Sequence, residues 1–139
     1  MFDNYEQLPA AVVTVTPFTT ETVVMVLPVS AAAINLTPEG RVIKGFLNVT
    51  VGTAGTLLSV KCRQGTTITG TQVGNTDTVT VAAAAVYQVP FSFLDTSSLA
   101  PLNNVYCITI TVTSASAVTT VNDGAVELFI PNPGGAVGE

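Results

Sequence analysis

Apolar and polar residues alternate one by one in several stretches of this chain, and this pattern limits its fold more than any other feature. The clearest stretch is residues 104–113, where alternate positions place apolar side chains on one face and Cys or Thr on the other. The apolar face comprises Tyr106, Ile108, Ile110 and Val112. A period of two is typical of a strand with one buried face, so we predict an all-β protein.

Turn residues separate these stretches at short intervals. Thr37-Pro38-Glu39-Gly40 fits a tight turn, and Asn122-Asp123-Gly124 fits a bend or hairpin. Hardly any segment carries the apolar stripe of an amphipathic helix. We therefore predict an eight-stranded antiparallel sandwich of the jelly-roll type over residues 10–130. The expected strands are residues 10–16, 22–29, 41–51, 56–63, 76–82, 86–94, 104–113 and 117–130.

Both ends of the chain differ from the middle. Residues 131–139 are rich in Pro and Gly and are predicted to form a flexible tail. Residues 1–9 are predicted to form an extended arm that carries Phe2, Tyr5 and Leu8. These three side chains either anchor the protein on a partner or fold back over its own sandwich, and the sequence leaves both interpretations open.

Charged residues are scarce, at 9% of the chain, against about a quarter in a typical globular domain. The surface must therefore consist largely of small polar side chains or be covered by other chains, which favours a homo-oligomeric assembly. With a net charge of −5 and four cations in all, the chain is not expected to bind nucleic acid. Those cations are Arg41, Lys44, Lys61 and Arg63.

No membrane or secretion signal is expected in this sequence. The first residues are acidic, and no apolar run reaches the ~18 residues of a membrane span. Cys62 and Cys107 are far apart in sequence and form no metal motif. They can form a disulfide only if the fold brings them together, which the sequence does not decide.

The chemistry needed for catalysis is largely missing. The chain has no histidine, which excludes a Ser-His-Asp or Cys-His arrangement, and it has no phosphate-binding Gly-Lys loop. The carboxylates lie near predicted turns, where solvated or capping roles are the usual ones. We therefore predict no catalytic residues, no cofactor and no metal site.

One motif requires separate treatment. Residues 93–98, Phe-Leu-Asp-Thr-Ser-Ser, resemble the signature of aspartic proteases, in which two carboxylates share one proton. A retroviral-type dimer would supply one Asp95 from each chain. Ser97 replaces the usual glycine, however, and no Gly-rich flap follows. We expect Asp95 to be structural, at the end of a strand, and keep the protease as a remote alternative.

Residues 63–66 and 70–74 resemble a stretch found in small trimeric β-sandwich proteins of tailed-phage heads, and residues 106–112 and 125–130 continue the similarity loosely. The resemblance implies a jelly-roll cement, or decoration, protein of a bacteriophage capsid. Such a protein binds the exterior of the assembled virion as a homotrimer, with the major capsid protein of the same virus as its partner.

A binding module is the main alternative. The head domain of a phage tail or fibre protein would recognise a host receptor through its loops. The loops of this chain offer mainly Gly, Thr, Ser and Asn, and the chain has no Trp for sugar stacking. We therefore favour the structural virion protein over the receptor-binding domain.

Overall fold

The computed structural model describes residues 2–6, 13–15, 20–28, 40–96, 105–113 and 119–129, with the backbone alone for the first two segments. Every regular element in these ranges is a strand, which confirms the all-β prediction. None of the described residues belongs to a helix that could cross a membrane. The strands are β1 (Phe2–Glu6), β2 (Val13–Val15), β3 (Glu21–Pro28), β4 (Arg41–Val51), β5 (Leu57–Gln64), β6 (Gln72–Thr80), β7 (Ala85–Asp95), β8 (Val105–Thr113) and β9 (Thr119–Phe129).

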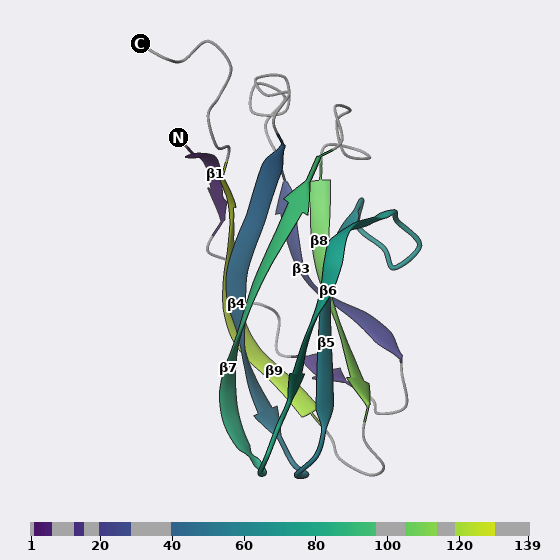
Figure 1. The fold of residues 1–139 in the computed structure, drawn as a ribbon, viewed down its shortest axis with the longest axis vertical. Coiled ribbons are helices and arrows are strands. Elements are labelled where there is room, and N and C mark those ends of the chain that lie inside the picture. Colours follow the sequence, from purple (N-terminus) through teal and green to yellow (C-terminus); the bar gives the residue numbers. More distant parts are fainter. Residues whose placement is uncertain are drawn as a thin grey trace.

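These strands form two antiparallel sheets that pack face to face (Figure 1). One sheet has the order β1-β9-β4-β7, with β2 also on β9, and the other has the order β3-β8-β5-β6. Among the described strands, only β5 and β6 are both consecutive in sequence and paired. β1 and β2 both pair with β9, and every other connection between the described strands passes from one sheet to the other. This strand order is that of a jelly roll.

The structure describes nine strands, one more than the eight predicted. The additional strand is β1, which lies in the segment predicted to be an arm ahead of the sandwich. It pairs with residues 126–129 of β9, and β2 pairs with residues 119–121 of the same strand. The two are thus successive pieces of one edge strand. The pattern of side chains missed β1 because edge pairing uses backbone groups, which polar residues supply as well as apolar ones.

A second boundary was also wrong. We predicted a strand from residue 76, but β6 begins at Gln72. The glycines in this segment indicated a loop, whereas Gly74 adopts a positive φ of 69° within the strand. The β5–β6 register shifts nearby, between Val60 and Cys62, so the glycine accompanies a bulge.

The core lies between the two sheets. Alternate residues of each long strand face inward, as the period of two predicted, and many of these side chains have no exposed surface. Fully buried side chains include Leu27, Ile43, Leu47, Leu58, Tyr106, Ile108, Ile110 and Leu128. At the edge where β6 of one sheet meets β7 of the other, the Ser92 amide donates to Asp77 Oδ2 over 3.0 Å.

The two cysteines are free and buried. Cys62 is paired with Ile108, and its neighbour Arg63 is paired with Cys107. Residues paired across two strands share a face, whereas consecutive residues point to opposite faces. Cys62 therefore faces the core and Cys107 the outer side of the same sheet, so the sheet itself separates the two thiols.

Candidate interaction site

Asp95, the candidate catalytic residue of the protease alternative, lies in a buried polar cluster. It ends β7 directly opposite Arg41, the first residue of β4, and Tyr106 approaches from β8 in the other sheet. Arg41 Nη2 donates to Asp95 Oδ2 over 3.0 Å, and Arg41 Nε donates to the Tyr106 hydroxyl over 2.9 Å. That hydroxyl in turn donates to Asp95 Oδ2 over 2.5 Å. Arg41 and Tyr106 are 0% exposed and Asp95 is 5% exposed.

This cluster joins the two sheets at one end of the sandwich. Burial raises the pKa of Tyr106, and its hydrogen bond to Asp95 raises the pKa further, so the phenol stays protonated and keeps donating. An aspartic protease needs a second carboxylate at this position, whereas Asp95 faces a guanidinium and a phenol. The geometry is that of a structural ion pair. The downstream part of the motif, residues 97–98, lies outside the described residues.

A second charged cluster lies on the outer side of the β3-β8-β5-β6 sheet. Arg63 makes a bidentate contact with Glu21, with Nε to Oε2 at 2.6 Å and Nη2 to Oε1 at 2.9 Å. Thr109 also donates to Glu21 Oε2 over 2.6 Å, and Lys61 Nζ lies 3.9 Å from Oε1. The Arg63 hydrogen bond is the main cause that lowers the pKa of Glu21, and burial opposes it. The cluster ties β3, β5 and β8 together.

The same arginine braces the connection between β5 and β6, which we term the 65–71 loop. Arg63 Nη1 donates to the Gly70 carbonyl over 2.9 Å, and backbone bonds from Gln64 to Thr71 and from Gly65 to Val105 fix both ends. Ile68 lies in this loop with 45% of its surface exposed. The loop projects from the side of the sandwich away from β9 (Figure 1).

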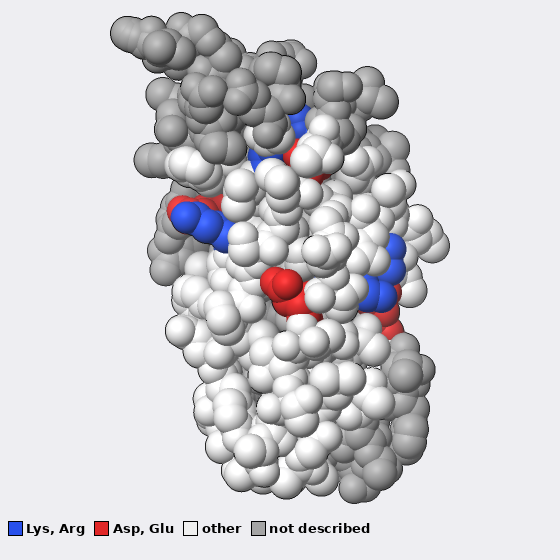
Figure 2. Space-filling model, viewed as in Figure 1, with Lys and Arg blue, Asp and Glu red and all other residues white. Residues whose placement is uncertain are grey.

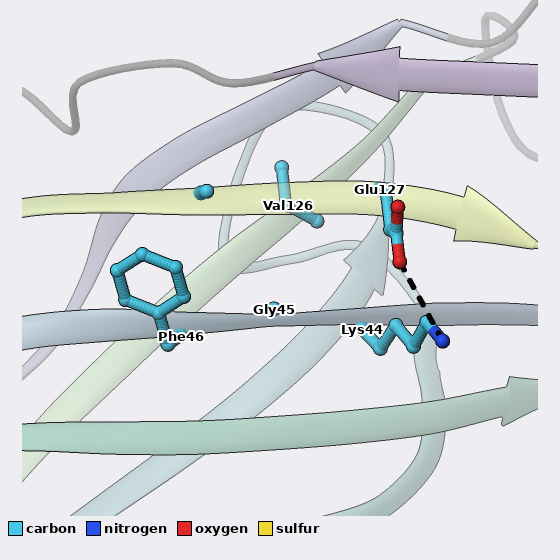
Figure 3. Close-up of a pocket in the computed structure, with 6 residues that line it drawn as sticks. Lys44, Gly45, Phe46, Val126 and Glu127 are labelled. Carbon is cyan, nitrogen blue, oxygen red and sulfur yellow. Dashed lines mark ion pairs between the residues drawn. The ribbon is translucent and has the colours of Figure 1, made fainter.

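A groove lies on the outer face of the opposite sheet, between β4 and β9 (Figure 3). Its volume is about 260 Å³. The floor is backbone and apolar side chain, and the rim carries Lys44 and Glu127, whose charged groups are 3.5 Å apart. Lys44 also lies 5.4 Å from the centre of the Phe129 ring. The lining residues are Lys44, Gly45, Phe46, Ala125, Val126 and Glu127.

Gly45 is required where β4 and β9 approach each other at the groove. A Cβ at this position would lie 1.9 Å from the Ala125 carbonyl oxygen, which is far inside contact distance. Sequence reasoning missed this groove. The available signal was the glycine itself, because a glycine inside an otherwise regular strand marks a close backbone approach.

The described charges are few and scattered. Figure 2 shows them as small separate groups on one face of the molecule, and the lower part of that face shows no charged side chain. All four cations have a carboxylate partner within 4 Å, supplied by Glu21, Asp95 or Glu127. The described part of the surface is thus mostly uncharged, as the composition indicated.

The residues predicted to anchor the protein are only partly described. Phe2 and Tyr5 belong to β1, of which the structure describes the backbone, and Leu8 lies outside the described residues. The predicted tail at residues 131–139 is also outside them. The anchoring role of Phe2, Tyr5 and Leu8 therefore stays a prediction.

Solved structures with a similar fold include structures from infectious bursal disease virus. A structure of the Gt strain of infectious bursal disease virus matches 94% of this chain with a TM-score of 0.59 and 12% identity. The crystal structure of the VP2 subviral particle of the same virus matches 96% with a TM-score of 0.57 and 14% identity. In both, the match spans 34% of the other chain, so this chain has about a third of their length. No family model and no curated protein matches the sequence.

The likeness shows that the chain shares an all-β sandwich fold with a protein of this virus. At 12–14% identity it shows a common fold alone. The expectation of an all-β sandwich is thus supported by the structure and by these matches. The narrower resemblance, to cement proteins of tailed phages, has no counterpart among these matches.

Proposed function

We propose that this chain is a structural protein of a virus particle. In the specific form of the proposal, it is a decoration, or cement, protein that binds the outer surface of an assembled bacteriophage head as a homotrimer. Its partner is the major capsid protein of the same virus. The observation that carries the proposal is the jelly-roll strand order in a chain with so few charges, a fold it shares with a virus particle protein.

The rest of the geometry fits a passive binding role. The candidate catalytic carboxylate is buried in an ion pair, and the apolar groove between β4 and β9 offers a site for another protein's side chain. A subunit that binds only the assembled shell stabilises it by mass action, without any chemical step. Repetition over the symmetric shell surface turns a weak single contact into durable attachment.

Attachment is assigned to the N-terminal segment with Phe2, Tyr5 and Leu8. Large apolar and aromatic side chains dominate interface energies, and this segment holds three of them within eight residues. Since β1 is an edge strand on β9, it lies at the border of a sheet, where a neighbouring protein has access to it.

Electron cryo-microscopy of the virus particle that carries this protein tests the proposal. We expect density for a jelly-roll trimer on the outside of the shell, resting on the major capsid protein. Density at the tail or on a fibre would favour the receptor-binding alternative. Density within the shell lattice itself would show a shell-forming subunit and would overturn the decoration role.

A further inference from the structure

The groove between β4 and β9 needs an apolar occupant that brings no charge. Its lining includes residues 45–46 and 125–126, among which Phe46 and Ala125 carry the apolar side chains that share the outer face. Its two charged rim groups, Lys44 and Glu127, neutralise each other at 3.5 Å. A charged side chain entering here would lose water and gain no free partner, whereas an aliphatic side chain would lose nothing.

The described part of the chain offers three large apolar side chains that are well exposed. They are Ile68 at 45%, Val86 at 65% and Leu94 at 49%. Val86 and Leu94 alternate with the inward-facing residues of β7, so they stand on the same outer face as the groove. Contacts through that face alone would pair two copies about a two-fold axis and form a dimer.

Ile68 lies on the other side of the sandwich, in the 65–71 loop beyond the β3-β8-β5-β6 sheet. Its loop is held in place by Arg63 and by backbone hydrogen bonds at both ends. The Cys107 thiol also contacts the Thr67 carbonyl, at 3.8 Å. A braced loop loses little conformational entropy when its tip is buried in a partner, so Ile68 is a preorganised anchor.

We infer that Ile68 of one copy docks in the β4–β9 groove of the next copy. Ile68 and the groove are on different sides of the molecule, so the contact is head to tail, and it closes into a ring of three where successive copies are rotated by about 120°. The inference rests on the proposed homotrimer and names the surfaces that form it.

The charges of the chain favour this contact. With a net charge of −5, copies repel unless they meet through neutral surfaces. The 65–71 loop contains no charged residue, and the groove carries one cation and one carboxylate that pair with each other. Three threonines surround Ile68, and their hydroxyls suit the polar rim of the groove. They are Thr66, Thr67 and Thr69.

Disulfide cross-linking between copies tests the inference. The double variant Ile68→Cys with Lys44→Cys places one thiol in the 65–71 loop and one on the groove rim. Both positions are exposed in the single copy. We expect mild oxidation to give covalent dimers and trimers on a denaturing gel. Each single variant should give no covalent trimer. The native thiols Cys62 and Cys107 are buried, so the wild-type protein, which has only these two, measures the background cross-linking.

A matched pair of charge variants supplies a second readout. Ile68→Asp should raise the concentration needed for trimer formation by about tenfold or more in analytical ultracentrifugation, as expected for loss of an interface anchor. Thr66→Asp adds the same charge two residues away and should change the concentration needed for trimer formation much less. Equal effects of the two variants would show that charge, and not the anchor, is responsible.

The outcomes separate this inference from the proposed function. A wild-type trimer without the 44–68 cross-link would overturn the inference and leave the cement role standing. A dimer that cross-links through cysteines at Val86 or Leu94 would overturn both the inference and the trimer. A cross-linked trimer that is absent from virus particles would uphold the contact and reject the cement role.

Discussion

Arg41 and Asp95 are 54 positions apart in the sequence, and they meet because β4 begins where β7 ends. Both side chains are almost completely removed from water, and Tyr106 links them to the second sheet. Breaking a buried ion pair by removing one charge is costly because the remaining charge stays buried. The cluster therefore accounts for stability at this end of the sandwich.

Asp95→Asn is expected to lower the free energy of unfolding by about 3–5 kcal/mol, because Arg41 loses its carboxylate partner. Urea denaturation measures the change. The matched control is Asp123→Asn on the exposed part of β9, which should cost less than about 1 kcal/mol. Equal losses in the two variants would contradict the assigned role, and peptide cleavage at acidic pH that depends on Asp95 would restore the protease alternative.

Glu21 gives the stability a dependence on pH. Its pKa is lowered in the folded protein, chiefly by the hydrogen bond from Arg63, so its contribution to stability is present at neutral pH. That contribution is expected to disappear as the pH falls below the ordinary pKa of a glutamate and through the lowered folded value. Glu21→Gln should reduce the stability at pH 7 and flatten this acid-side decline. An unchanged profile in melting curves from pH 7 to pH 3 would contradict the assignment.

The roles of single residues were predictable only in part. The position of Asp95 between an alternating stretch and a polar turn predicted that it would end a strand and have a structural role. Its pairing with Arg41 could not be predicted, because that contact depends on which strands become neighbours. The separation of Cys62 from Cys107 likewise required the β5–β8 register, which the sequence leaves open.

At the level of the strands, β4 and β9 approach each other closely at Gly45. Gly45→Ala places a methyl group 1.9 Å from the Ala125 carbonyl oxygen, so the β4–β9 ladder must move. We expect a loss of at least about 3 kcal/mol in the free energy of unfolding, at the upper end of overpacking costs. Lys44→Ala, on the next residue, removes an exposed ion pair and should cost about 1 kcal/mol or less. A tolerated Gly45→Ala would show that the two strands are less tightly joined.

The side chains of the N-terminal segment can be tested without removing the strand β1. Replacing Phe2, Tyr5 and Leu8 together with serine keeps the backbone that pairs with β9. If they anchor the protein on a shell, binding to particles should weaken sharply, since each buried anchor contributes about 1.5–3 kcal/mol. The melting temperature of the free protein should change little. A large fall in that temperature with unchanged binding would show that they pack on the protein's own sandwich.

The strands themselves were largely predictable, because a buried face imposes a period of two on the sequence. All eight expected segments overlap an observed strand. The missed pieces, β1 and the start of β6, share a physical reason. An edge strand and a bulged strand hold their places by backbone hydrogen bonds and glycine conformations, which leave little trace in apolar patterning.

For the molecule as a whole, the number and spacing of strands indicated a jelly roll, but the sheet to which each strand belongs emerged only from the structure. The groove and the braced 65–71 loop are also properties of the folded molecule. The groove joins residues 44–46 to residues 125–127, and the loop is held in part by a bond from Gly65 to Val105, so both depend on contacts between segments far apart in sequence.

The most direct measurement of the central claim is the return of purified protein to virus shells from which it has been removed. Cosedimentation at increasing protein concentration should show saturable binding at a stoichiometry that is a multiple of three per attachment site. The loaded shells should also melt at a higher temperature than the stripped ones, because the protein binds only the assembled form. Absence of binding, or binding that leaves the melting temperature of the shells unchanged, would contradict the account.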